Sequence, residues 1–309
     1  MKRDLLSLED FSSEEIQTIL RMTKKVKGTR NHSSGILSGK TIGLVFQKPS
    51  NRTRVSFEVG IAQLGGNCIY LGPEEINLGV RETTEDVAKT LTRYLDGIVA
   101  RTHKHEDIVD LTKYSTIPVI NGLSDLYHPC QALTDLFSIE EKLGELKGLT
   151  LAYVGDGNNV CHSLLLGCAK VGMNMQIATP KGEYSPNASV VQKALEYAKA
   201  TNAKIVLTND PNEAVNKADV IYADVWVSMG QEEESEKRLK DFQGFQINKE
   251  LLKTANKNYV FMHCLPAHRG LEVAADVIDG DHSIVFDQAE NRLHTQKAIL
   301  IFLYERRRN

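Results

Sequence analysis

The stretch Lys48-Pro49-Ser50-Asn51-Arg52-Thr53-Arg54 decides the fold of the first half of the chain. Before it, residues 41–46 are apolar and rich in branched side chains, and after it, residues 55–64 carry apolar side chains at helical spacing. The sequence therefore predicts a strand, a tight turn and a helix. The first backbone N–H groups of a helix lack intrahelical acceptors and the helix dipole favours negative charge there, so this turn can bind a phosphate.

Side chains in the same stretch favour an anion site. Ser50 and Thr53 offer hydroxyl groups, and Arg52 offers a guanidinium fork that pairs with phosphate oxygens. A capped helix with arginines on its surface fits these residues equally well, and spacing alone does not separate the two interpretations.

The rest of the chain alternates strand-like and helical patterns. The strand candidates after residues 41–46 are residues 67–71, 97–101, 118–121, 149–154, 175–178, 205–208, 220–224, 259–263 and 283–286. Such alternation is typical of α/β folds with parallel sheets. A helical pattern without glycine or proline lies between Pro129 and Gly144, and we place a domain boundary near residues 135–148.

Composition argues against several classes of protein. The chain has 309 residues and a formal net charge of -3, with acidic and basic residues mixed along it, so we expect no nucleic-acid partner. Its five cysteines lack the spacing of a zinc site or a disulfide framework, which indicates reduced thiols. No apolar run resembles a signal peptide or reaches the length of a membrane span. We therefore expect a cytoplasmic protein that does not enter a membrane.

The turn Gly155-Asp156-Gly157 raises the alternative of dinucleotide binding. A Rossmann fingerprint has a third glycine three residues later and an acidic residue at the end of the next strand. Here Val160 occupies the glycine position, and the next strand candidate is followed by Thr179-Pro180. The sequence therefore argues against a nicotinamide oxidoreductase. What remains is a sharp turn that presents Asn158 and Asn159 at the carboxyl edge of a sheet, where open α/β folds bind ligands.

Polar side chains at other strand ends and helix starts are further candidates. Arg101 ends a predicted strand and suits a second cationic contact with phosphate, although a surface arginine fits this position equally well. His128 precedes Pro129 at a helix start, where a neutral imidazole is favoured and can donate to a developing oxyanion. Asp224 ends another strand and suits a substrate ammonium, or else serves as a turn or cap residue.

Five motifs together resemble the aspartate/ornithine carbamoyltransferase family in order and spacing, over essentially the whole chain. They are Ser50-Asn51-Arg52-Thr53-Arg54, His128-Pro129-Cys130-Gln131, the segment from Asp224 to Gly230, His263-Cys264-Leu265-Pro266 and Ala289-Glu290-Asn291-Arg292. The Cys264-Leu265 pair and the loop that contains Asp224 and Ser228-Met229 are similar to the ornithine branch of the family rather than the aspartate branch.

The resemblance implies a fold and an assembly. The fold is α/β, with two parallel-sheet, three-layer domains joined by two interdomain helices. Residues 1–134 would bind carbamoyl phosphate, residues 135–291 would bind ornithine, and a C-terminal helix at about 292–309 would pack back on the first domain. The implied assembly is a homotrimer, or a multiple of trimers, with active sites shared between neighbours.

The resemblance also implies the reaction, in which the carbamoyl group of carbamoyl phosphate passes to the δ-amine of L-ornithine without a metal or an organic cofactor. The products are L-citrulline and phosphate. The implied catalytic residues are Arg101, His128 and Cys264. The implied ligands of carbamoyl phosphate are Ser50, Asn51, Arg52, Thr53, Asn77, Arg101, His128, Gln131, Cys264, Leu265 and Arg292. The implied ligands of ornithine are Asn159, Asp224, Ser228 and Met229.

Two residues depart from the family pattern. Asn51 stands where the family usually has threonine, but its backbone N–H remains, so we expect phosphate binding to persist. Asn77 stands where many relatives carry a glutamine or histidine that reaches a neighbouring subunit, and its shorter side chain leaves that contact open. Putrescine or an acylated ornithine also stays open as the acceptor, as does the direction of the reaction. A non-catalytic paralogue is disfavoured because the residues it would be expected to lose are all present, namely Arg52, Arg101, His128 and Cys264.

Overall fold

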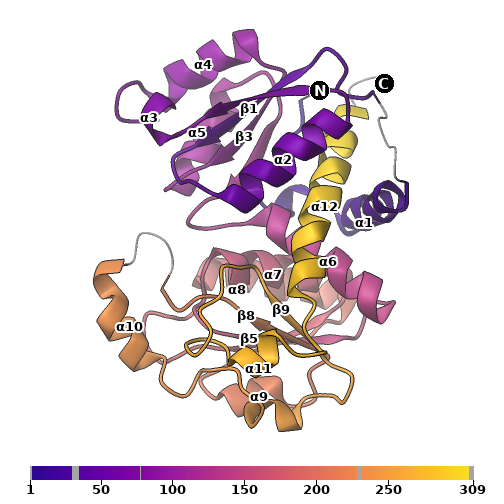
Figure 1. Ribbon diagram of the computed structural model, residues 1–309, viewed down its shortest axis with the longest axis vertical. Helices are drawn as coiled ribbons and strands as arrows, with labels where there is room; N and C mark the ends of the chain where they lie inside the picture. Colours follow the sequence, from indigo (N-terminus) through magenta and orange to yellow (C-terminus); the bar gives the residue numbers. More distant parts are fainter. Residues whose placement is uncertain (1, 30–34, 77, 228–231, 306–309) are drawn as a thin grey trace. The chain divides into compact units, whose positions relative to one another are not determined.

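The structure is a computed structural model that describes residues 2–29, 35–76, 78–227 and 232–305. It divides into unit 1, which comprises Met1–Phe137 and Glu290–Asn309, and unit 2, which comprises Ser138–Ala289. The chain passes from one unit to the other within two long helices, α6 (Pro129–Leu143) and α12 (Val285–Glu305) (Figure 1).

Unit 1 contains a four-stranded parallel sheet in the order β2-β1-β3-β4. Its strands are β1 (Thr41–Phe46), β2 (Asn67–Leu71), β3 (Gly97–Arg101) and β4 (Val119–Leu123). Its helices, besides parts of α6 and α12, are η1 (Leu8–Asp10), α1 (Ser13–Lys27), α2 (Asn51–Gln63), α3 (Pro73–Ile76), α4 (Thr84–Tyr94) and α5 (His105–Tyr114). Because all four strands are parallel, their carboxyl ends share one edge of the sheet.

Helices cover both faces of this sheet. On one face, α4 and α5 bury Val87 and Ile108 in a cluster that includes Ile98 of β3. On the other face, α2 and the C-terminal part of α12 lie side by side (Figure 1), and Lys297 Nζ donates to Gln63 Oε1 at 2.8 Å. The amphipathic pattern of α4 and α5 accounts for their side of this layering, since each of these two helices turns its apolar stripe toward the sheet.

Unit 2 contains a five-stranded parallel sheet in the order β7-β6-β5-β8-β9. Its strands are β5 (Thr150–Val154), β6 (Asn174–Ala178), β7 (Ile205–Thr208), β8 (Val220–Ala223) and β9 (Val260–His263). Its helices are α7 (Asn159–Val171), α8 (Ala188–Thr201), α9 (Pro211–Val215), η2 (Glu232–Glu234), α10 (Ser235–Asp241), η3 (Leu251–Thr254) and α11 (Ala275–Ile278). The residues of α9, η3 and α11 share one apolar cluster with alternate residues of β5 and β8.

The prediction of an α/β protein with two parallel sheets is confirmed. The strands predicted at residues 41–46, 67–71, 97–101 and 205–208 coincide with β1, β2, β3 and β7. Most other predicted strands differ from the structure by one or two residues at an end, where strand boundaries are weakly encoded. Among the described residues, every helix is too short or too polar to span a lipid bilayer.

One predicted strand, residues 283–286, is wrong. Ser283 forms only an isolated bridge with Phe261, and the helix α12 begins at Val285. The apolar run Ile284-Val285-Phe286 resembles a strand because a short apolar run cannot be distinguished from a helix turn by periodicity. For the same reason α12 starts seven residues before the start at 292 that the sequence predicts for the last helix.

Candidate active site

The first half-site forms in unit 1 where β1 leads into α2. Ser50 is the N-cap of α2, and its Oγ accepts a hydrogen bond from the backbone N–H of Thr53 at 3.3 Å. Asn51, Arg52 and Thr53 therefore make up the first turn of the helix. The backbone N–H groups of such a turn can bind an anion, as the sequence predicts.

Arg101 lies at the carboxyl end of β3, the strand beside β1. Phe46 of β1 is its partner in the ladder, and the backbone N–H of Gln47 donates to the carbonyl of Arg101 at 2.8 Å. The register against β4 shifts between Ala100 and Arg101. Such irregularities change the direction of a side chain and are frequent next to active sites. The Arg101 side chain is buried, so it is not the surface arginine of the alternative interpretation.

A hydrogen-bonded chain connects α2, α6 and α12 within unit 1. Arg292 Nη2 donates to Thr53 Oγ1 at 3.1 Å, and Arg292 Nη1 donates to Gln131 Oε1 at 2.6 Å. Gln131 Nε2 in turn donates to Asp135 Oδ1 at 2.8 Å. All four side chains are buried. Three motifs that are far apart in the sequence therefore meet through one guanidinium group.

His128 occupies the N-terminus of α6. Its carbonyl accepts hydrogen bonds from the backbone N–H groups of Gln131 at 3.1 Å and Ala132 at 3.2 Å. Burial lowers the pKa of the imidazole well below its usual 6.5, and the positive charges of Arg292, Arg101 and Arg52 lower it further. The ring is therefore neutral at pH 7, as the sequence predicts for a histidine at this position. We call Arg52, Arg101, His128 and Arg292 the cationic cluster. A dianion is a suitable ligand for it, because three guanidinium groups lie near enough to the neutral ring to lower its pKa.

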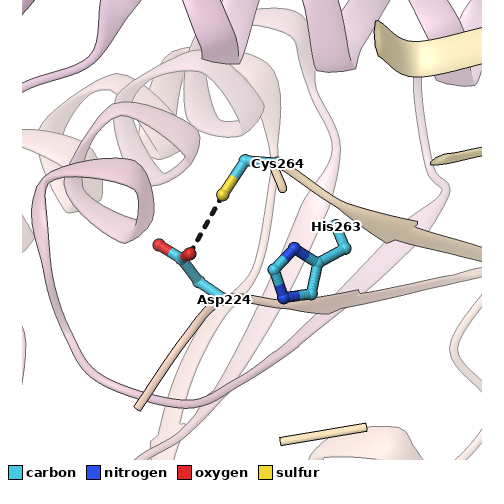
Figure 2. Close-up of side chains that lie close together, drawn as sticks. All are labelled: Asp224, His263 and Cys264. Carbon is cyan, nitrogen blue, oxygen red and sulfur yellow. Dashed lines mark hydrogen bonds between the residues drawn. The ribbon is translucent and has the colours of Figure 1, made fainter. Parts of the chain in front are cut away.

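The second half-site forms in unit 2 at the carboxyl ends of two adjacent strands. Ala223 of β8 pairs with His263 of β9, so the residues that follow them, Asp224 and Cys264, are neighbours. Cys264 Sγ donates a hydrogen bond to Asp224 Oδ1 at 3.0 Å (Figure 2). The backbone N–H of Val225 donates to the same oxygen at 2.8 Å. A buried carboxylate and a thiol are thus held together where an amine can be bound.

Asn158 is a further donor to Asp224, and the sequence predicts its place at the edge of the sheet but not this contact. Asn158 Nδ2 donates to Asp224 Oδ2 at 2.7 Å. Its Oδ1 accepts from the backbone N–H groups of Val160 and Cys161, at 3.0 and 3.2 Å, and so caps α7. The only sequence feature that pointed to Asn158 was its N-cap position after the predicted strand that became β5. Asn159, the predicted ligand of ornithine, is the first residue of α7.

The turn before α7 is closely packed, and this packing accounts for its glycines without a bound dinucleotide. A Cβ atom on Gly157 would lie 2.3 Å from the backbone nitrogen of Pro186. A larger residue would therefore collide with the neighbouring loop. The adjacent Asp156 forms a buried ion pair, with its Oδ2 2.7 Å from Arg238 Nη1. Arg238 also donates to the carbonyl of Trp226 at 3.1 Å, so it connects the turn to the segment after β8. The sequence did not predict this role of Arg238.

The segment after β9 has an unusual backbone. Leu265 has a positive φ of 58°, and its peptide bond to Pro266 is cis. The backbone N–H of Leu265 donates to His263 Nδ1 at 2.9 Å. Cys264 lies between these two residues, so the histidine ring and the leucine backbone hold it on both sides. Asn77, Ser228 and Met229, three other predicted ligands, lie outside the described residues.

Asp224, His263 and Cys264 also offer potential metal ligands, since one donor atom from each lies within 4.8 Å of the others. However, His263 Nδ1 already accepts a hydrogen bond from Leu265, and Nε2 lies 3.3 Å from Glu272 Oε1. Only the carboxylate and the thiol then remain, whereas zinc sites in proteins use three or four protein ligands. The arrangement suits an amine better than a metal ion.

Comparison with known protein families matches both parts of the chain. Residues 3–141 match the carbamoyl-P binding domain of the aspartate/ornithine carbamoyltransferases, and residues 147–303 match their Asp/Orn binding domain. The chain is 54% identical over 300 residues to the ornithine carbamoyltransferase of Thermococcus kodakarensis, which covers 96% of this chain and 95% of that protein. It is 55% identical over 303 residues to that of Bacillus anthracis, which covers 98% and 95%.

Solved structures agree with these matches. The ornithine carbamoyltransferase from Pyrococcus furiosus is similar with a TM-score of 0.93 and 53% identity, over 97% of this chain and 96% of that chain. The anabolic enzyme from Campylobacter jejuni is similar with a TM-score of 0.93 and 38% identity, over 99% and 100%. The resemblance read from five motifs thus extends over the whole fold, and the chain belongs to the aspartate/ornithine carbamoyltransferase family.

Proposed function

We propose that the protein is an ornithine carbamoyltransferase, which transfers the carbamoyl group of carbamoyl phosphate to the δ-amine of L-ornithine and releases L-citrulline and phosphate. The observation that carries the proposal is the pair of half-sites. A cationic cluster lies in the part that matches the carbamoyl-P binding domain, and the bonded Asp224–Cys264 pair lies in the part that matches the Asp/Orn binding domain. The high identity to ornithine carbamoyltransferases supports it.

In this proposal unit 1 binds carbamoyl phosphate. The first turn of α2, from Ser50 to Thr53, and the guanidinium groups of Arg52, Arg101 and Arg292 take the phosphate. Arg101 and the neutral imidazole of His128 donate to the carbonyl oxygen. Gln131 holds Arg292 in place through the 2.6 Å hydrogen bond. We also propose that Asn77 binds carbamoyl phosphate.

Unit 2 binds ornithine. The Asp224 carboxylate and Asn159 bind the α-amino and carboxylate ends of the substrate, with Ser228 and Met229. The thiol of Cys264 and the carbonyl of Leu265 hold the δ-nitrogen next to the carbamoyl group. The hydrogen bond between Cys264 Sγ and Asp224 Oδ1 gives the thiol a defined direction.

The chemistry of transfer explains why both kinds of half-site are needed. The δ-amine attacks the carbonyl carbon only when it is neutral, although a free alkylammonium has a pKa of about 10.4. Negative charge then grows on the carbonyl oxygen and on the departing phosphate. Preorganised donors at such positions each contribute about 3 kcal/mol to the stability of the transition state. The cationic cluster supplies these donors.

We also propose the assembly and location that the family resemblance implies, a cytoplasmic homotrimer or multiple of trimers. Val55 and Val59, one turn apart on α2, are 54% and 39% exposed, and Ile69 on the edge strand β2 is 49% exposed. Exposed apolar side chains on two elements that contact each other, as α2 and β2 do, are typical of protein interfaces. They support self-association through unit 1. In this proposal carbamoyl phosphate binding belongs to residues 1–134 together with the C-terminal helix from about residue 292, and ornithine binding belongs to residues 135–291.

The proposal is tested by assaying the purified protein with carbamoyl phosphate and four acceptors: L-ornithine, putrescine, N-acetylornithine and aspartate. We expect citrulline from ornithine, with a kcat/KM well above those for the other acceptors. The assay is repeated with a chelator, which should leave the activity unchanged. Comparable or faster turnover of putrescine would contradict the assignment of Asp224 and Asn159 to the amino-acid end of the substrate.

A further inference from the structure

The carboxylate of Glu272 lies behind the second half-site and is not used by the proposed reaction. The His263 and Glu272 side chains are 0% and 1% exposed, and His263 Nε2 lies 3.3 Å from Glu272 Oε1. The contact does not meet hydrogen-bond geometry, so it is a close electrostatic contact. Glu272 Oε1 also accepts from the backbone N–H of His268 at 2.5 Å. Removing a carboxylate from water is costly, so a carboxylate in the protein interior requires an explanation.

The hydrogen bond from Leu265 to His263 determines the tautomer of the ring. Because Nδ1 accepts from the backbone N–H of Leu265 at 2.9 Å, Nδ1 carries no proton. A ring with a single N–H therefore carries it on Nε2, which lies 3.3 Å from Glu272 Oε1. Negative charge at this position favours that tautomer, in the way that a carboxylate orients a histidine in many enzyme and metal sites.

The same contacts hold the segment from His263 to His268 at two points. His263 anchors Leu265 near the start, and His268 binds the same carboxylate near the end. Between them Leu265 has a φ of 58°, a conformation that a residue with a Cβ atom rarely adopts unless its surroundings fix it. Cys264, whose Sγ contacts Asp224, precedes this residue directly. Loss of the anchor would remove one of the contacts that fix the backbone at Cys264 and Leu265.

We propose that Glu272 is a positioning residue for carbamoyl transfer to ornithine. It acts through the Nε2–H tautomer of His263 on the backbone of Leu265, and so fixes the Cys264 thiol and the Leu265 carbonyl that hold the δ-amine. This inference rests on the proposed function. The competing explanation is a buried pair that stabilises the fold and has no specific effect on ornithine.

The kinetic test compares Glu272→Gln, Glu272→Asp and the control Glu250→Gln, whose side chain is 79% exposed and pairs with Lys253 in the same unit. A glutamine at 272 can still accept from His268, but its amide lacks the negative charge that favours Nε2–H. We expect Glu272→Gln to lower kcat/KM for ornithine by about 10- to 100-fold, as for a misplacement of a reacting group by about 1 Å. The Kd for carbamoyl phosphate should stay within about twofold, because its phosphate is proposed to bind in unit 1 and the contacts of Glu272 described above lie in unit 2.

Glu272→Asp keeps the charge and should recover part of the loss, and Glu250→Gln should match the wild type. The inference is overturned if Glu272→Gln retains the kcat/KM of the wild type. It is also overturned if binding of ornithine and carbamoyl phosphate falls together with the melting temperature, or if the aspartate variant is no better than the glutamine variant.

A spectroscopic measurement tests the tautomer that the inference requires, and it needs none of the Glu272 variants. Two-bond ¹H–¹⁵N correlation spectra of the protein labelled at histidine report the ring tautomer, and His263→Asn assigns the signal. We expect the Nε2–H tautomer for His263, and a predominant Nδ1–H tautomer would overturn the inference. This readout does not depend on the substrate. Failure of the proposed function would instead appear as a wild-type protein that does not carbamoylate ornithine.

Discussion

Unit 1 gathers positive charge around a buried neutral imidazole, whereas unit 2 arranges hydrogen bonds around one buried carboxylate. Arg52, Arg101 and Arg292 all lower the pKa of His128, so the first half-site is organised by electrostatics. In the second half-site, Asp224 accepts hydrogen bonds from the thiol of Cys264 and the amide of Asn158, so directional hydrogen bonds organise this half-site. The difference matches the proposed substrates. Attraction between charges does not depend on direction and suits a phosphate dianion, whereas an attacking amine has to be oriented by directional hydrogen bonds.

The contrast also determines how each half-site responds to mutation. Loss of one guanidinium from the cationic cluster should weaken anion binding and leave the amine unaffected. Loss of one hydrogen-bond partner in unit 2 should misdirect the amine and leave the anion unaffected. Each prediction below tests one side of this separation.

The largest effect is expected for Arg101→Ala. Its guanidinium is proposed to face both the phosphate and the carbonyl oxygen, where charge grows only in the transition state. Loss of such a donor lowers kcat by about 10²–10³-fold. Steady-state kinetics at saturating carbamoyl phosphate measures this, with Arg93→Ala, an exposed arginine on α4, as the control. An unchanged kcat would make Arg101 a residue of substrate binding alone.

A smaller effect is expected for Arg52→Ala. A charge-assisted hydrogen bond to a dianion contributes roughly 1.5–3 kcal/mol, so the Kd for carbamoyl phosphate should rise about 10- to 100-fold. The melting temperature should hardly change, because the side chain is only half-buried. Equilibrium binding and thermal unfolding on the same variant measure both. A lower melting temperature with unaltered binding would instead identify a merely capped helix.

Cys264→Ala tests unit 2. We expect kcat/KM for ornithine to fall about tenfold, because the thiol is proposed to hold the δ-nitrogen and one hydrogen bond contributes about 1 kcal/mol or more. The Kd for carbamoyl phosphate should stay nearly the same, because the phosphate group is proposed to bind in unit 1. Cys68→Ala, at a partly exposed cysteine on β2, serves as the control. Weaker binding of carbamoyl phosphate with normal use of ornithine would reverse the assignment.

The smallest effect concerns pH. Burial and three arginines lower the pKa of His128, so the unfolded chain takes up a proton as the pH falls through 6.5 while the folded chain does not. The contribution of His128 to stability is therefore complete above pH 6.5 and is lost below it, by up to about 1.4 kcal/mol per pH unit. Denaturant unfolding of the wild type and of His128→Asn at pH 5.5 and 7.5 measures the difference. Equal pH dependence of the two proteins would contradict a depressed pKa.

The two half-sites also differ in how far the sequence reveals them. The strand, turn and helix around Ser50 lie in one continuous stretch, so periodicity and capping rules were enough to predict β1 and α2. His128 at the start of α6 was predicted for the same reason. These features depend on hydrophobic periodicity and helix capping, which act between residues close together in the sequence.

The remainder depends on contacts between distant residues, which periodicity does not encode. Asn158 reaches Asp224 across 66 positions, and Arg238 reaches Asp156 across 82. Glu272 lies in a segment without regular structure and has no motif of its own. The false strand at residues 283–286 shows the same limit, because only the packing of a long helix decides the state of a short apolar run.

The separation of the two half-sites is tested most directly by titrating inorganic phosphate into the wild type, Arg52→Ala and Cys264→Ala by isothermal calorimetry. Phosphate lacks a carbamoyl group and an amine, so it reports the anion site alone. We expect Arg52→Ala to bind phosphate about 10- to 100-fold more weakly and Cys264→Ala to bind it like the wild type. Equal weakening in both variants, or normal binding by Arg52→Ala, would contradict the account.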